Sequence, residues 1–404
     1  MLQQLKRFFS TLSQREKPPL GYLPHEIQQQ FVNELDQDFV REIVTANNHF
    51  ASDMYGRMGE APGNLFFSPH SIFIALGLVY IGAKRETAEQ MSTTLHLPRE
   101  HDTLFQTADI LKRYMIALEK HGLIELKSAN ALWPAIKHQV HILNSYVETV
   151  TERFGAQIIP LNYTQADKAV GRINKWATKQ TAGRIKNILS PSQVSDDTTL
   201  ILTNAIYFKG NWDSRFRKHN TIDDLFWLTA EECVDVPLMH QTSDFRYAQV
   251  DSNQILEMPY KGHALSMLVI LPKNHAELDT VEAHIAQHGF SSWEQQFKWR
   301  DVEVYLPKFR FSTDYGLNGT LQSLGMVCPF KDNGTADFSG ITDHPDQFYI
   351  ETVIHKGFIE VTETGTEAAA VTAVTMSMAM SAPAQEAEPI PIFRADRPFI
   401  FAYP

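Results

Sequence analysis

The sequence has little of what marks several common protein classes. Its 404 residues include only two cysteines, Cys233 and Cys328, so a disulfide framework is excluded and at most one disulfide can form. No apolar run approaches the roughly 20 residues of a membrane-spanning helix, so we expect no membrane insertion. Lys and Arg number 36 against 47 Asp and Glu, and the net charge of −11 argues against nucleic-acid binding. With 43% hydrophobic residues, the chain must be stabilised by core packing.

Motifs of common active sites and metal sites are also lacking. There is no Gly-x-Ser-x-Gly elbow, no phosphate-binding glycine loop and no His-Glu-x-x-His pair. His284 and His288 lie four residues apart and could bind a metal ion, but no third ligand is evident. We therefore predict no metal and no cofactor.

The N-terminus lacks the apolar stretch of a secretory signal peptide, which favours an intracellular (cytoplasmic) location, with secretion as the alternative. Residues 1–46 are predicted to be a partly helical N-terminal extension, followed by a single domain over residues 47–404. The segment from His25 to Met58 predicts one long amphipathic helix, since five apolar residues recur near helical spacing: Ile27, Phe31, Leu35, Phe39 and Ile43.

Helices dominate the first half of the chain and strands the second. Ser68-Pro69 predicts a helix start, with Ser68 as the cap and a buried body from Ile72 to Ile81. Residues 166–180 predict another helix. The expected strands are Thr199–Phe208, Leu256–Met258, Leu265–Leu271, Val302–Leu306, Phe348–Val353 and Phe358–Val361. This order favours an α+β fold with antiparallel sheets.

The stretch from Gly365 to Pro391 contains no Lys, Arg or aromatic residue, and connections of this length are usually functional or disordered. If it formed a strand, every even-numbered side chain from Thr366 to Met378 would be uncharged, so that face could be buried in a sheet. About a dozen new main-chain hydrogen bonds would contribute on the order of 10 kcal/mol, before burial and the ordering cost. A low-complexity linker is the alternative.

The motifs along the chain resemble those of the serpin family, inhibitory type, from Asn47 to Tyr403. The matching segments are Asn64-Leu-Phe-Phe-Ser-Pro-His-Ser-Ile72, Ile173-Asn-Lys-Trp176, Leu202-Thr-Asn-Ala-Ile-Tyr-Phe-Lys-Gly-Asn-Trp212, Leu256-Glu-Met-Pro-Tyr-Lys-Gly262, Ala336-Asp-Phe-Ser-Gly340, Glu363-Thr-Gly-Thr-Glu-Ala-Ala-Ala370 and Phe393-Arg-Ala-Asp-Arg-Pro-Phe399. The resemblance implies three β-sheets, about nine helices and an exposed reactive-centre loop over residues 363–391.

The resemblance also implies a mechanism. A serine protease would cleave the loop and be trapped as a covalent acyl-enzyme when the loop inserts into the main sheet, so the chain would be a monomeric suicide inhibitor and not an enzyme. Counting from the hinge places the reactive bond at Ala379–Met380, which suits elastase-like or chymotrypsin-like proteases. Met378 and Met380 are near rivals as the scissile residue. The stretch from Ala379 to Pro398 is several residues longer than in many relatives, so a site further on, toward Ala384, is also an alternative.

The remaining implied site residues form two groups. The loop hinge comprises Glu363, Gly365, Thr366, Glu367, Ala368, Ala369 and Ala370, whose small, uncharged inward side chains would allow insertion. The gate to sheet opening comprises Ser68, Ser71, Asn204, His355 and Trp212.

Three alternatives qualify this interpretation. A non-inhibitory binding or storage protein on the same fold is one, and a hydrolase using His355 is another, although no acid evidently pairs with that histidine. The chain also ends at Pro404, inside the strand that begins at Pro398, so we expect the family's last strand to be missing, with edge groups left unpaired.

Overall fold

The computed structural model describes residues 24–59, 63–98, 101–136, 141–344, 348–366 and 389–403. The chain divides into two compact units. The first contains Pro24–Phe208 and Phe311–Ile359, and the second contains Lys209–Arg310 and Glu360–Pro404. The predicted boundary at residues 46 and 47 falls inside a helix of the first unit.

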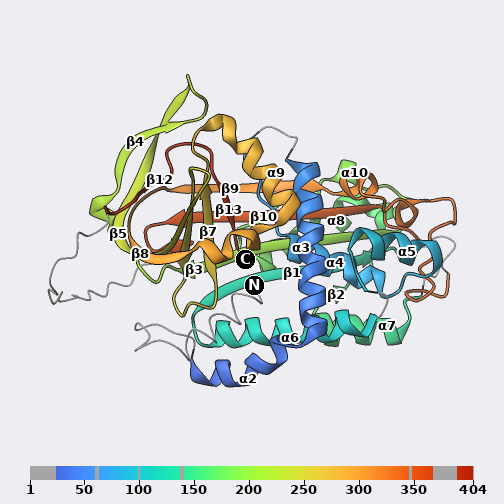
Figure 1. The fold of residues 1–404 in the computed structure, drawn as a ribbon. Coiled ribbons are helices and arrows are strands. Elements are labelled where there is room, and N and C mark those ends of the chain that lie inside the picture. Colours follow the sequence, from blue (N-terminus) through green and yellow to red (C-terminus); the bar gives the residue numbers. More distant parts are fainter. Residues whose placement is uncertain are drawn as a thin grey trace. The chain divides into compact units, whose positions relative to one another are not determined.

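The first unit holds most of the helices. They are α2 (His25–Leu35), α3 (Asp38–Met58), α4 (Pro69–Tyr80), α5 (Arg85–Thr94), α6 (His101–Lys120), α7 (Asn144–Thr149), α8 (Ala166–Gln180) and α10 (Asn318–Ser323). Helix α8 has the predicted bounds. Helix α6 runs alongside α2 and is crossed by α3 (Figure 1).

The single helix predicted from His25 to Met58 is wrong, because the chain forms α2 and α3 with a break at Asp36–Gln37. The predicted apolar positions are four residues apart, and a 3.6-residue period rotates such positions progressively around a straight helix. The break resets the buried face: Phe39 is only half-buried, while Val40 is fully buried instead. The first part, α2, packs against α6, with the Phe31 ring against that of Tyr114, and Ile27 and Leu35 of α2 are also buried.

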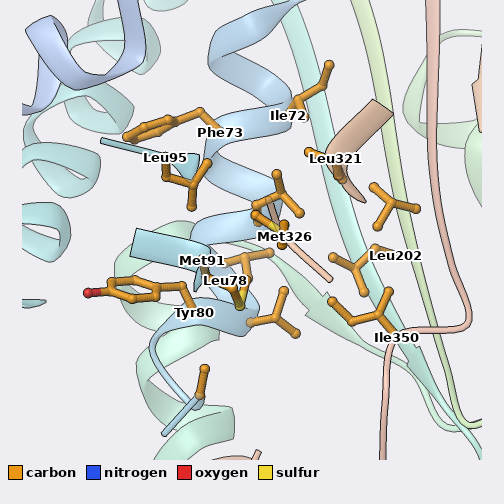
Figure 2. Packing of buried hydrophobic residues seen from close by; sticks show 14 of the residues in the cluster. Ile72, Phe73, Leu78, Tyr80, Met91, Leu95, Leu202, Leu321, Met326 and Ile350 are labelled. Atoms are coloured by element: carbon orange, nitrogen blue, oxygen red, sulfur yellow. The ribbon is translucent and has the colours of Figure 1, made fainter. Parts of the chain in front are cut away.

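Helix α4 is the centre of the first unit's core. The Ser68 hydroxyl accepts the backbone N–H of Ser71 at 3.2 Å, which confirms the predicted cap. The helix is apolar on nearly every side and is correspondingly buried. Figure 2 shows its side chains among residues from three other segments: Leu202, Leu321 and Ile350.

The strands of the first unit are β1 (Ile124–Pro134), β2 (Gln157–Ile158), most of β9 (Phe309–Gly316), and long parts of β3 (Leu200–Asn211) and β10 (Thr352–Thr362). Strands β3 and β10 pair directly and in parallel, from Ile201 opposite Thr352 to Tyr207 opposite Phe358. Strand β1 neighbours β3 on the other side. The strand expected to begin at Phe348 begins only at Thr352.

The second unit is built mainly of strands, with one α-helix, α9 (Leu278–His288), in its described part. The strands are β4 (Ile222–Trp227), β5 (Cys233–Val250), β6 (Asn253–Pro259), β7 (Ser266–Leu271), β8 (Lys298–Pro307), β11 (Gly365–Thr366), β12 (Ile392–Arg394) and β13 (Ile400–Ala402), together with the ends of β3, β9 and β10. Seven of these form one sheet, in the order β12-β8-β5-β6-β7-β13 with β4 on β5.

The α+β class is confirmed, but two of the three expected sheets are continuous with each other. The cause is β5, which has 18 residues. It pairs with β4 at its start, with β8 along its middle and with β6 at its end. Both cysteines are free, and none of the described helices is long and apolar enough to cross a membrane.

Candidate functional site

Four of the five predicted gate residues meet in the first unit, at the N-terminus of α4. His355 of β10 and Asn204 of β3 are directly opposite each other in the parallel ladder, and both are buried. His355 Nδ1 lies 2.5 Å from Asn204 Oδ1, and the backbone N–H of Ser68 donates to His355 Nε2 at 3.1 Å. A side-chain hydrogen bond therefore joins β3 to β10.

The network extends from β3 to α4 and β1. The Asn204 amide donates to the Ser71 carbonyl oxygen at 3.2 Å and to Asn130 Oδ1 at 2.5 Å. The Ser71 hydroxyl lies 3.0 Å from the Ser128 hydroxyl. Buried polar groups bonded in this way hold strands β1, β3 and β10 on one helix terminus.

The protonation state of His355 follows from its partners. Nε2 accepts the Ser68 N–H, so the proton lies on Nδ1 and is donated to Asn204. Burial lowers the pKa of His355 to about 3, so the ring is neutral at physiological pH.

This geometry does not fit a hydrolase. A nucleophilic serine would have to bond the histidine through its hydroxyl, but Ser68 contacts His355 through its backbone N–H. The Ser68 hydroxyl instead caps α4. The group that orients His355 is an amide rather than a carboxylate, and both ring nitrogens are occupied.

The start of the predicted loop lies in the second unit as β11, a strand of only two residues. Gly365 and Thr366 pair antiparallel with Asn211 and Gly210 of β3 on one side. On the other side they pair antiparallel with Thr362 and Val361 of β10. Two loop residues are therefore already placed between the ends of the two strands.

Gly365 is required at this position by its surroundings. Its φ is +149°, a conformation that residues with a side chain rarely adopt. A Cβ atom there would lie 2.0 Å from the Gly210 carbonyl oxygen and 2.7 Å from Asn211 Cα. Because both are backbone atoms of the paired strand, no side-chain rotation could relieve the overlap.

Thr366 is fully buried, as the even-numbered pattern predicts for an inward-facing residue. Its hydroxyl lies 2.6 Å from the Tyr260 hydroxyl. The Trp212 ring stacks on Tyr260 with centroids 4.6 Å apart, and Trp212 Nε1 donates to the Thr362 carbonyl at 3.0 Å. Burial raises the pKa of Tyr260 well above its usual value, so its hydroxyl stays protonated.

Glu363 fixes the turn between β10 and β11. Its carboxylate accepts hydrogen bonds from Lys308 Nζ and Thr221 Oγ1, each at 3.0 Å. Burial alone would raise the pKa of this carboxyl, but the bonds outweigh burial and the pKa lies below its usual value. Glu363 is therefore charged and paired with Lys308.

The predicted residues therefore form two sites and not one. Trp212, which was grouped with the gate, belongs with Glu363, Gly365 and Thr366 in the second unit. The other hinge residues, Glu367, Ala368, Ala369 and Ala370, and the reactive bond Ala379–Met380 lie outside the described residues.

Sequence reasoning missed Ser128, Asn130 and Tyr260. The signal for the first two is present, since they are polar residues two apart in a mostly apolar segment and so share one face of a strand. His284 contacts His288 and stacks on Trp293, but no cluster of three or more potential metal ligands occurs among the described residues.

Comparison with known proteins identifies the family. The family model described as serpin (serine protease inhibitor) matches residues 45–403. The chain belongs to the serpin family. A serpin-like protein of Thermococcus kodakarensis is 40% identical over 362 residues, which cover 89% of this chain and 82% of that protein. The leukocyte elastase inhibitor of Xenopus laevis is 36% identical over 375 residues, or 90% and 95% of the two chains.

Solved structures show the same serpin fold. Serpin48 of the insect Tenebrio molitor has a TM-score of 0.80 and 26% identity, with 91% of this chain and 95% of that chain covered. Human thyroxine-binding globulin, solved with its ligand, has a TM-score of 0.79 and 25% identity, with 90% and 95% covered. Helix α2 and the first part of α3 precede the segment of this serpin that the family model matches.

Proposed function

We propose that this serpin is an irreversible suicide inhibitor of serine proteases that traps the acyl-enzyme by inserting its cleaved loop between β3 and β10. The observation that carries the proposal is the direction of β11. It runs antiparallel to both strands, whereas β3 and β10 run parallel to each other along most of their length. A strand continuing β11 would replace one parallel ladder with two antiparallel ladders, which are slightly more stable per residue.

The register of β11 predicts which residues each position of an inserted loop would pair with. Thr366 is opposite Gly210 of β3 and Val361 of β10, so each further loop residue would pair one position earlier on both strands. Thr372 would then be level with both Asn204 and His355. Insertion therefore requires the Asn204–His355 hydrogen bond to break, and Thr372 brings a hydroxyl to the same level.

The same register supports Ala379–Met380 as the proposed reactive bond. Strand β3 begins at Leu200, which would face Met376, so Ala379 would lie three residues beyond the end of the paired region. From Thr366 to Ala379 the loop would extend about 43 Å at 3.3 Å per residue. A protease attached to Ala379 would be carried that far along the sheet.

The chemistry of trapping uses the protease's own mechanism. The protease serine attacks the Ala379 carbonyl, the bond to Met380 breaks with protonation of the leaving amine, and the ester remains. Insertion then displaces the protease before water hydrolyses the ester. The small Ala379 side chain suits an elastase-like or chymotrypsin-like pocket, and the name of the leukocyte elastase inhibitor relative supports this class. Met378, Met380 and Ala384 remain alternatives.

The test is incubation with an elastase-like protease, followed by denaturing electrophoresis. We expect a covalent complex and loss of protease activity. In Ala368→Arg the new charge lies on the face that insertion would bury, so we expect cleavage without complex. In the matched control, Glu367→Arg, the charge lies on the opposite face, which already carries one, so the complex should still form. Equal behaviour of the two variants would refute insertion.

A non-inhibitory binding protein is the second candidate, because the thyroxine-binding globulin structure shows that a protein of this fold binds a small ligand. It would be favoured if loop cleavage leaves the protein's resistance to unfolding unchanged. The cytoplasmic location stays a prediction.

A further inference from the structure

Apolar side chains are exposed on the hairpin formed by β4 and β5 in the second unit. The described chain has ten exposed large apolar side chains, and half of them lie on this hairpin: Ile222, Leu225, Trp227, Leu228 and Val234. The solvent-exposed face of an antiparallel sheet normally carries polar side chains. Side chains alternate between the two faces of a strand, so Leu225 and Trp227 share one face of β4, whereas Ile222 and Val234, which is paired with Phe226, lie on the other face. The exposed Leu225–Trp227 face is the candidate interaction surface.

The charge of the hairpin is of one sign. Between Ile222 and Met239 the sequence contains five acidic residues and no Lys or Arg: Asp223, Asp224, Glu231, Glu232 and Asp235. All but Asp224 are exposed. Asp223 and Asp235, which is opposite Leu225 in the register, lie on the same face as Leu225 and Trp227. An apolar pair flanked by acidic side chains fits a protein partner whose own apolar patch is flanked by basic ones. It disfavours a second copy, because two sets of acidic side chains would then meet.

The hairpin is linked to the strand at the far end of the loop. Arg394 of β12 forms an ion pair with Asp224 of β4 and lies over the Tyr305 ring, with 4.7 Å from its guanidinium carbon to the ring centroid. Two further exposed apolar residues lie at the start of this strand: Ile390 just before it and Ile392 as its first residue. Seven of the ten exposed large apolar side chains in the described part of the chain are therefore on the hairpin or at the start of β12.

The loop end is fixed to this part of the second unit. Arg300 donates to the Pro389 carbonyl at 3.1 Å, and the backbone N–H of Glu303 donates to the Pro391 carbonyl at 3.0 Å. Pro389 lies ten positions after Ala379 in the sequence, a reach of at most about 35 Å. A protease body that engages Ala379 is therefore restricted to the neighbourhood of β12 and the hairpin.

We propose that the β4–β5 hairpin is a docking surface for the body of the target protease, and that it selects a protease with a basic surface beside its active site. This inference rests on the proposed function. The loop presents the bond to be cleaved, and the hairpin determines which proteases of the same primary specificity reach it quickly.

The test uses two elastase-like serine proteases, one basic and one acidic, each with its active-site serine replaced by alanine. Binding to the full chain is measured as Kd at low and high salt. We expect Leu225→Ser/Trp227→Ser and Asp223→Lys/Asp235→Lys each to weaken binding of the basic protease about tenfold or more. The matched control is Ile116→Ser, which removes an equally exposed apolar side chain from α6 in the first unit.

The outcomes separate this inference from the proposed function. Unchanged Kd values in both hairpin variants would overturn docking, even if active protease still forms the covalent complex. Absence of that complex with wild-type chain would overturn the inhibitor, whatever the binding data show. A wild-type dimer in sedimentation that Leu225→Ser/Trp227→Ser dissociates would overturn the inference in favour of self-association. Equal unfolding midpoints of the variants and wild type check that the fold is retained.

Discussion

Replacing Gly365 with alanine tests whether the start of the loop is held between β3 and β10. The added Cβ would lie 2.0 Å from the Gly210 carbonyl oxygen, so β11 cannot keep its position. Displacing β11 breaks the hydrogen bond between the buried hydroxyls of Thr366 and Tyr260, which lowers the free energy of unfolding by about 1–3 kcal/mol. It also removes the short ladders to both strands, at about 1 kcal/mol for each bond lost.

We therefore expect Gly365→Ala to lower the free energy of unfolding by about 4 kcal/mol. The control is Gly325→Ala, because Gly325 also has a positive φ, +103°, but a Cβ there would meet nothing within 4 Å. The free energy of unfolding of that variant should fall only by the cost of backbone strain, about 1–2 kcal/mol. Urea unfolding followed by tryptophan fluorescence measures both losses. Equal losses would refute the placement of β11, since strain alone would then explain the effect.

Two further predictions concern the first unit. His355 has a folded pKa of about 3 against about 6.5 when unfolded, so its contribution to stability is complete above pH 6.5 and is lost as pH falls toward 3. Between pH 7 and pH 5 the His355 contribution should be about 2 kcal/mol in urea unfolding. His355→Gln should reduce the total loss by that amount and leave the part due to His70, whose pKa burial lowers to about 4; the same pH slope as in the wild type would contradict the assignment. Phe31→Ala should destabilise the chain by about 3 kcal/mol because Phe31 is buried against α6, whereas Glu34→Gln should cost under about 1 kcal/mol because the Glu34–Arg113 pair is about one-third exposed. Similar losses in these two variants would show that α2 is not held by its apolar face.

Local pattern was enough to predict some features. The cap at Ser68 and the bounds of α8 depend on neighbouring residues along the chain, so the sequence predicts them correctly. The burial of Thr366 agrees with the even-numbered face predicted from side-chain alternation. The predicted meeting of Asn204 and His355 came from the family resemblance, because no local pattern shows which strands are neighbours.

Other features depend on contacts that sequence spacing does not encode. The break between α2 and α3 places Phe31 on α6, a partner about 80 residues further along the chain, and apolar spacing alone predicted one helix. The partners of the gate on β1, Ser128 and Asn130, were missed because that strand was not predicted. The Tyr260–Thr366 bond joins residues 106 positions apart.

The most direct test of the central claim compares unfolding of the intact chain with that of the chain cut once between Ala379 and Met380. If the segment after Thr366 enters between β3 and β10, the cut protein should resist far higher temperature and urea concentration than the intact one. Its Asn204 and His355 should then each face an inserted residue instead of each other. A cut protein that unfolds at the same midpoint as the intact chain, or below it, would contradict the account.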